Sequence, residues 1–289
     1  MLRKAMLLRS RNCWTNNPNP PKQTCMNRCA RFYAITSSRR WLSLIARLFN
    51  NSRSLLLMYD DAQSLYRRER ALNFSLASVG IQAQGRTSIL RINYRNSRRI
   101  LNFACAFSRD YFEKNHNQDV PLVLPEACGE EGDIPDIVRC QSAEDEARCV
   151  VAWLKEKQAE TGRWGDMAVL CPTHFSADQL TALMKQHQIP AAASFALADK
   201  TRYSHREDVV HLLTFQSSKG LAFPFVAVIN ASFVHKGAES ESEAIPALYV
   251  AFTRAIRSLL VTCYKENRIS RHLTKFTGME LEDVQNDRS

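Results

Sequence analysis

Four short clusters of polar residues carry side chains that could bind phosphate, orient water or contact nucleic acid. Residues 60–66 (DDAQSLY) follow a short apolar run and include Gln63, whose amide can sense a phosphate or orient a water molecule. Residues 93–96 (NYRN) include Arg95, whose guanidinium suits bidentate contact with a phosphate. Taken singly, each of these clusters is explained as well by an ordinary polar turn or a surface ion pair.

The other two clusters lie in the last third of the chain. Residues 214–223 (TFQSSKGLAF) combine hydroxyls, Lys219 and Gly220 after an apolar run, which could bind an anion at a helix N-terminus. The phosphate-binding pattern G-x-x-x-x-G-K-[ST] occurs nowhere in the chain. Residues 248–255 (LYVAFTRA) place Arg254 in an apolar helix, where it must pair with a carboxylate or face a charged ligand.

Short apolar strands that alternate with helices position these clusters. The predicted strands are residues 54–59, 87–92, 134–140, 167–171, 209–213, 225–230 and 259–263. The predicted helices are residues 41–48, 97–112, 144–158, 177–187 and 242–257. This alternation predicts an α/β fold with a largely parallel sheet. Ligands of such sheets bind beyond the carboxyl ends of the strands, so we expect the polar clusters there.

The net charge of +10 is concentrated at the N-terminus. Residues 1–59 contain 11 Lys or Arg and no Asp or Glu, whereas the remaining residues contain 28 basic and 29 acidic side chains. Charge alone therefore does not make the body of the protein a nucleic-acid binder. The expected organisation is a basic, disordered or degenerate segment (1–40), one α/β domain (41–270) and a polar tail (271–289).

Residues 1–40 are open to three interpretations. They could form a disordered basic arm that contacts phosphates, or an organelle transit peptide, which is also rich in Arg and poor in acids. They could also be a decayed or wrongly started segment, an interpretation favoured by the abrupt change of composition near Trp41.

The nine cysteines are scattered and odd in number, which indicates a reducing, cytoplasmic setting without disulfides. Cys25 and Cys29 have no second ligand pair nearby, so we expect no metal site in the chain. The longest apolar runs, residues 149–154 and 247–252, have six residues, far fewer than the roughly 18–20 that cross a bilayer, so no membrane partner is expected.

Together, and in this order, the four clusters resemble motifs III, IV, V and VI of the UvrD/Rep-like superfamily 1 DNA helicases. Residues 60–66 resemble motif III, residues 93–96 motif IV, residues 214–223 motif V and residues 248–255 motif VI. The resemblance covers about residues 41–265. It implies a C-terminal, RecA-like motor domain, which is a parallel sheet flanked by helices and lacks a P-loop of its own.

The resemblance further implies an ATP-dependent 3′ to 5′ DNA helicase with a role in DNA repair, in which ATP and Mg²⁺ bind between two RecA-like domains. It implies that the nucleotide site includes Gln63, Arg95, Gly220 and Arg254. Within this site, Gln63 would sense the γ-phosphate, and Arg95 and Arg254 would contact it catalytically. It implies that single-stranded or partly duplex DNA passes near Thr214, Gln216 and Tyr66.

Several family features are missing from this sequence. No P-loop is present, and no acidic motif II precedes Asp60. Gln216 stands where the family has His, Ala222 where it has the Glu expected near the ribose, and Pro246 where it commonly has Arg. Pro246 is also expected to interrupt the helix. Without a P-loop Lys and a Mg²⁺ ligand, the phosphates lose their main charge neutralisation, so we expect no ATP hydrolysis by this polypeptide alone.

Three functions remain open on the sequence. The chain could be an enzyme half that needs a P-loop-bearing N-terminal helicase half as its partner. It could be a non-catalytic module that binds single-stranded DNA or a protein. It could also be a decayed helicase fragment without function.

Overall fold

The chain forms two compact units in the computed structural model. One unit is Met1–Ile92 with Val123–Pro125, and the other is Asn93–Leu122 with Glu126–Ser289. The structure describes residues 3–8, 29–33, 39–48, 54–59, 75–82, 84–85, 87–90, 92–115, 125–127, 129–194, 207–234 and 244–279. The division falls inside the range 41–270, which the sequence analysis treats as one domain.

The first unit contains a four-stranded sheet in the order β2-β3-β1-β4. Its strands are β1 (Arg3–Leu8), β2 (Cys29–Tyr33), β3 (Ser54–Tyr59) and β4 (Thr87–Leu90). β1 is antiparallel to both β3 and β4, and β2 is parallel to β3. β1 and β2 lie in residues 1–40, where the sequence analysis expects no regular structure, because the composition there shows no apolar alternation.

Two helical elements of the first unit contact one another. They are α2 (Arg39–Leu48) and the short 3₁₀ helix η2 (Leu76–Val79). Leu42 of α2 is 1% exposed, and Val79 of η2 is also buried. The amphipathic pattern after Trp41 therefore predicts the helix correctly, although Trp41 and Leu44 of its apolar residues are 63% and 47% exposed.

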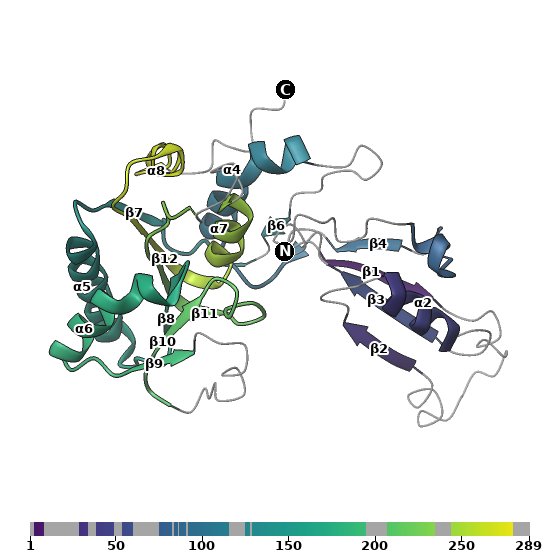
Figure 1. The fold of residues 1–289 in the computed structure, drawn as a ribbon, viewed down its shortest axis with the longest axis horizontal. Coiled ribbons are helices and arrows are strands. Elements are labelled where there is room, and N and C mark those ends of the chain that lie inside the picture. Colours follow the sequence, from purple (N-terminus) through teal and green to yellow (C-terminus); the bar gives the residue numbers. More distant parts are fainter. Residues whose placement is uncertain are drawn as a thin grey trace. The chain divides into compact units, whose positions relative to one another are not determined.

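The second unit is built on a six-stranded sheet in the order β7-β12-β11-β8-β10-β9, with every neighbouring pair parallel (Figure 1). Its strands are β7 (Asp136–Arg139), β8 (Met167–Cys171), β9 (Ala191–Ser194), β10 (Val210–Thr214), β11 (Phe223–Val228) and β12 (Ala255–Cys263). A separate two-stranded ribbon pairs β5 (Ile92–Asn93) with β6 (Glu126–Ala127).

Helices cover both faces of the six-stranded sheet (Figure 1). α5 (Ala143–Thr161) and α6 (Asp178–Gln186) pack together on one face, and α4 (Arg98–Asn115) and α7 (Ile245–Phe252) pack on the other. A 3₁₀ turn, η3 (His174–Ala177), precedes α6, and α8 (Arg268–Thr274) follows β12. The predicted α/β fold, a parallel sheet flanked by helices, is confirmed.

Each face of the sheet has its own apolar core. Under α5 and α6 the core is mainly aliphatic and includes Val150, Leu154, Val169 and Leu212, each at most 1% exposed. Under α4 and α7 it is aromatic: the rings of Phe103 and Phe107 lie 5.0 and 5.3 Å from the ring of Phe252. Aromatic pairs at these separations add packing energy beyond their buried area, so both layers hold the sheet firmly.

The structure corrects two boundaries around the last motif. The helix predicted for residues 242–257 ends at Phe252, and β12 begins at Ala255, because Ala255 pairs with Phe223 at the start of β11. Pro246 does not interrupt α7 but lies in its first turn. A first-turn amide has no intrahelical acceptor, so proline is tolerated there.

β9 and α8 are among the elements that the sequence did not predict. β9 has the sequence AAAS, which is too short and too small in side chains to be recognised as a strand. α8 begins before residue 271 with a capping box, in which Asn267 and Ser270 bond each other's backbone amides. Among the described residues, no helix is long and apolar enough to cross a membrane.

Candidate functional site

The described residues of the expected nucleotide site meet at the amino edge of the six-stranded sheet. Arg254 directly precedes β12, and the Asn96 side chain donates hydrogen bonds to the carbonyls on either side of it, Thr253 (3.0 Å) and Ala255. Ser97 donates its backbone N–H to the Ile256 carbonyl at 2.9 Å. The expectation that these clusters lie at the carboxyl edge is therefore wrong for Arg95 and Arg254, because both flank the start of β12.

Two buried asparagines shape the turn that carries Arg95. The side-chain carbonyl of Asn93 accepts hydrogen bonds from the backbone N–H of Arg95 (2.8 Å) and of Asn96 (3.2 Å). The Asn93 amide donates to the Asn96 side-chain oxygen at 2.9 Å. This Asx turn leaves Tyr94 76% exposed and Arg95 half-buried. The sequence assigned no role to either asparagine, although their spacing of three residues is the signal of such a turn.

Arg254 is fully buried, and its guanidinium donates to main-chain carbonyls. Nε bonds the Val250 carbonyl at 2.9 Å, and Nη1 bonds the Leu221 carbonyl at 3.0 Å. Nη2 lies 3.4 Å from the Thr253 hydroxyl. The side chain thus connects the end of α7 to the segment that enters β11. The sequence analysis expects a carboxylate or a charged ligand for Arg254 and does not foresee these carbonyls.

The third cluster, residues 214–223, runs from the carboxyl end of β10 to the amino end of β11. At its start, Thr214 N–H donates to the Ser217 hydroxyl at 2.8 Å, and Ser217 N–H donates to the Thr214 hydroxyl at 3.0 Å. Gln216 is exposed beside them, whereas Ser217 and Ser218 are buried. The expected DNA-contacting residues Thr214 and Gln216 therefore lie at the carboxyl edge.

The far end of this cluster lies at the amino edge. Gly220 has φ +88°, a left-handed conformation that suits glycine, and Leu221 follows it with its carbonyl bonded to Arg254. The structure thus separates Thr214 and Gln216 from Arg95 and Arg254 and links the two edges through one short segment. Gln63 and Tyr66 lie outside the described residues.

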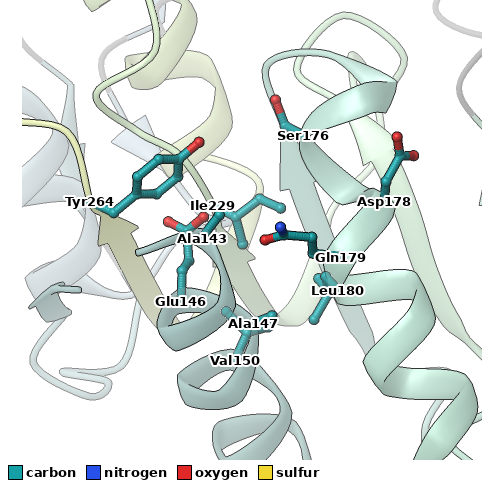
Figure 2. Close-up of a pocket in the computed structure, with 10 residues that line it drawn as sticks. All are labelled: Ala143, Glu146, Ala147, Val150, Ser176, Asp178, Gln179, Leu180, Ile229 and Tyr264. Atoms are coloured by element: carbon teal, nitrogen blue, oxygen red, sulfur yellow. The ribbon is translucent and has the colours of Figure 1, made fainter. Parts of the chain in front are cut away.

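A pocket that the sequence analysis did not foresee opens at the carboxyl edge, with a volume of about 320 Å³ (Figure 2). It is lined by Ala143, Glu146, Ala147, Val150, Ser176, Asp178, Gln179, Leu180, Ile229 and Tyr264. The Glu146 carboxylate accepts a hydrogen bond from the backbone N–H of Asn230 at 2.8 Å. Burial raises the pKa of Glu146 above its usual value, against the opposing effect of the hydrogen bonds from Asn230 and Thr262.

Among the described residues, no group of three or more His, Cys, Asp or Glu side chains is placed to hold a metal ion. Burial also raises the pKa of Cys140 and Cys171 to about 12. At that pKa the reactive thiolate is scarce at neutral pH, so these two thiols behave as apolar side chains.

Residues 89–194 match the sequence profile of the UvrD-like helicase C-terminal domain. The chain is structurally similar to the C-terminal domain of a possible DNA helicase from Lactobacillus plantarum WCFS1, with 19% identity, a TM-score of 0.45, and 63% of this chain and 94% of that chain covered. It is more distantly similar to an Arterivirus nonstructural protein 10 helicase in complex with DNA, with 11% identity, a TM-score of 0.30, and 46% and 30% of the two chains covered. No curated protein matches the chain.

The profile match begins in β4, includes the turn with Arg95, and ends with β9. Its span holds helices α4, α5 and α6 and three strands of the six-stranded sheet. Residues 89–194 are therefore similar to the UvrD-like helicase C-terminal domain.

Proposed function

We propose that this chain is the C-terminal motor half of an ATP-dependent 3′ to 5′ DNA helicase. The observation that carries the proposal is the junction between Asn96 and the two carbonyls that flank Arg254. It joins the turn with Arg95 to the segment with Arg254, although more than 150 residues separate them in the sequence. Two arginines brought to one edge are what a domain needs to stabilise phosphate charge in a partner domain's site.

The exposed tip of the Asn93 turn suits one side of a nucleotide. The Tyr94 ring is open to solvent and can stack on a base, and Arg95 beside it can reach a phosphate. Arg254 is fully buried in this structure, and its Nε and Nη1 donate to main-chain carbonyls. Arg254 would therefore position the other residues of the site and would not contact the phosphate, unless closure of the two motor halves exposes its guanidinium.

ATP would bind with Mg²⁺, which would neutralise the phosphates when bound. The chain has no P-loop and no acidic motif before Asp60, so the Lys and the Mg²⁺ ligands would come from a P-loop-bearing N-terminal half. The residues of this chain would bind the base and stabilise charge from the opposite side. We infer that this polypeptide alone does not hydrolyse ATP.

DNA would pass along the opposite edge, near Thr214 and Gln216. Exposed Gln216 can contact a nucleic-acid backbone, and the hydroxyls of residues 214–217 hold the turn that presents it. The segment that continues to Leu221 and Arg254 would transmit motion between the DNA edge and the nucleotide edge. A role in DNA repair and a cytoplasmic location stay predictions.

ATP hydrolysis tests this proposal when measured with and without single-stranded DNA. We expect none from the chain alone, and DNA-stimulated hydrolysis after the P-loop-bearing N-terminal half of a UvrD-like helicase is added. Arg95→Ala should lower the activity of the mixture about 10³-fold, as loss of an arginine finger does. Arg163→Ala, an exposed arginine after α5, is the matched control and should leave it unchanged.

Two results would contradict the proposal. Hydrolysis by the chain alone, abolished by Arg95→Ala, would mean that a complete site exists without a partner. A mixture that stays inactive, or one that is indifferent to Arg95→Ala, would mean that this chain is not a motor half. Binding of labelled single-stranded DNA without any hydrolysis would then favour a non-catalytic module.

A further inference from the structure

The pocket at the carboxyl edge has no part in the proposed nucleotide site. It lies between the first turns of α5 and α6, at the ends of β11 and β12 (Figure 2). Arg95 and Arg254 lie at the other edge of the same sheet, where β12 begins. A ligand of the pocket would therefore be distinct from the nucleotide.

The polar groups that face the pocket select for a positive charge. Glu146 and Asp178 bring two carboxylates, and the ten lining residues include no Lys, Arg or His. Glu146 is 3% exposed and is anchored by the Asn230 N–H, so its carboxylate is part of a built wall. A phosphate would be repelled here, whereas a buried carboxylate is stabilised by a cation.

The remaining walls are apolar and would hold an aliphatic chain. Ala147 and Val150 contribute from α5, Leu180 from α6, and Ile229 from the segment after β11. The Tyr264 ring lines the same space and lies beside the Glu146 carboxylate in Figure 2. An apolar stem with a cationic head fits such a lining, because the stem packs while the head pairs with charge.

A second observation is a buried acceptor without a partner behind this wall, on a residue that does not itself line the pocket. Asn230 is 3% exposed, follows Ile229 directly, and donates to the lining Ser176 hydroxyl at 3.3 Å. Its side-chain carbonyl has no hydrogen-bond partner among the described residues. Such an orphaned acceptor is costly, and a donor-rich group next to Ser176 could satisfy it after a small rotation.

From these observations we propose that the pocket binds the arginine side chain of a protein partner. A guanidinium offers five donors in one plane, so it can bond Glu146 and a second acceptor together. The aromatic face of Tyr264 suits the same planar cation. A neutral side chain or a phosphate would leave the carboxylates unmatched.

Titration with two short peptides tests the proposal on the full chain. The probes are acetyl-Gly-Arg-Gly-amide and its citrulline counterpart, which has nearly the same shape but no charge. Backbone amide NMR shifts of Ala147, Gln179 and Ile229, which line the pocket, report binding there. We expect the arginine peptide to shift them and to bind about tenfold or more tightly than the citrulline peptide.

Variants assign the binding to the carboxylate. Glu146→Gln keeps an acceptor for the Asn230 N–H but removes the charge, and should weaken the arginine peptide about tenfold. Glu144→Gln, an exposed carboxylate on the same helix turn that does not line the pocket, should leave binding unchanged. If Glu146→Gln does not fold, Asp178→Asn at the exposed rim provides the second test.

The same data can overturn the proposal. Equal affinity for the two peptides, no shift with either, or arginine binding that is indifferent to both pocket variants would exclude an arginine pocket. Shifts of the same amides on addition of a short oligothymidine, but not of the arginine peptide, would assign the pocket to nucleic acid instead.

Discussion

Buried polar side chains fix the geometry of the amino edge at the scale of single residues. Asn93, Asn96 and Arg254 are each at most 5% exposed, and together they bond the main chain of two segments that are distant in sequence. Burial of polar groups is tolerated only when they are bonded, so each member depends on the others. The exposed Tyr94 and the half-buried Arg95 owe their positions to this buried framework.

Arg254→Ala tests the structural part of this framework. Because it removes the Arg254 donor from the Leu221 carbonyl and one of two side-chain donors from the Val250 carbonyl, we expect the free energy of unfolding to fall by about 3 kcal/mol. Urea unfolding followed by far-UV circular dichroism measures the change. Arg257→Ala, three residues on and exposed, is the control and should cost less than about 1 kcal/mol. Equal losses in the two variants would show that Arg254 does not hold the edge together.

At the scale of secondary-structure elements, backbone contacts position the turn that carries Arg95. The first amides of α4, those of Arg98 and Arg99, donate to the carbonyls of Glu130 (3.0 Å) and Glu131 (3.2 Å). Helix-start amides have no acceptor within their own helix, so the segment before β7 supplies it. Gly132 then turns this segment past Ser97 with φ +72°. The hydrogen bonds to Glu130 and Glu131 and the close approach of Gly132 to Ser97 hold the α4 N-terminus and the Asn93 turn in place.

Gly132→Ala and Gly162→Ala form a matched pair, since both glycines have φ +72°. A Cβ at Gly132 would lie 2.2 Å from the Ser97 side chain, whereas nothing lies within 4 Å of one at Gly162. We expect Gly162→Ala to cost about 1 kcal/mol from backbone strain, and Gly132→Ala about 2 kcal/mol more from overpacking. The unfolding free energies of the two variants check this. Similar losses of unfolding free energy in the two variants would mean that the segment at Gly132 can move away from Ser97 to make room for a methyl group.

At the scale of the whole molecule, the two compact units have separate cores. All six parallel strands and the helices on both their faces belong to the second unit. The mainly aliphatic core under α5 and α6 and the aromatic core around Phe252 contain residues of that unit alone. A sheet with both faces covered has the buried surface that an independent domain needs.

A fragment of residues 92–279 should therefore fold without the rest of the chain. We expect it to unfold cooperatively in urea, because its core and both strands of the β5–β6 ribbon are intact. Circular dichroism and the sharpness of the transition, compared with the full chain, provide the measurement. A fragment with a broad, non-cooperative transition would show that the first unit contributes to the core of the second.

The local pattern of the sequence is enough to predict most strands and helices of the second unit. Residues 167–171 are a strand as predicted, and α5 and α6 lie within a few residues of their expected bounds. Apolar runs and helical spacing are local signals, so they survive without any tertiary information. The motif residues could be picked out for the same reason, because their types and order are visible in the chain.

Only the tertiary structure decided which motifs meet and how their side chains are used. The sequence determined that Arg254 must be paired, but not that its partners are the carbonyls of Val250 and Leu221. It determined a parallel sheet, but not that Arg95 and Arg254 share its amino edge while Glu146 opens a pocket at the other. Strand order and burial depend on contacts between residues far apart in the chain, and no local pattern encodes them.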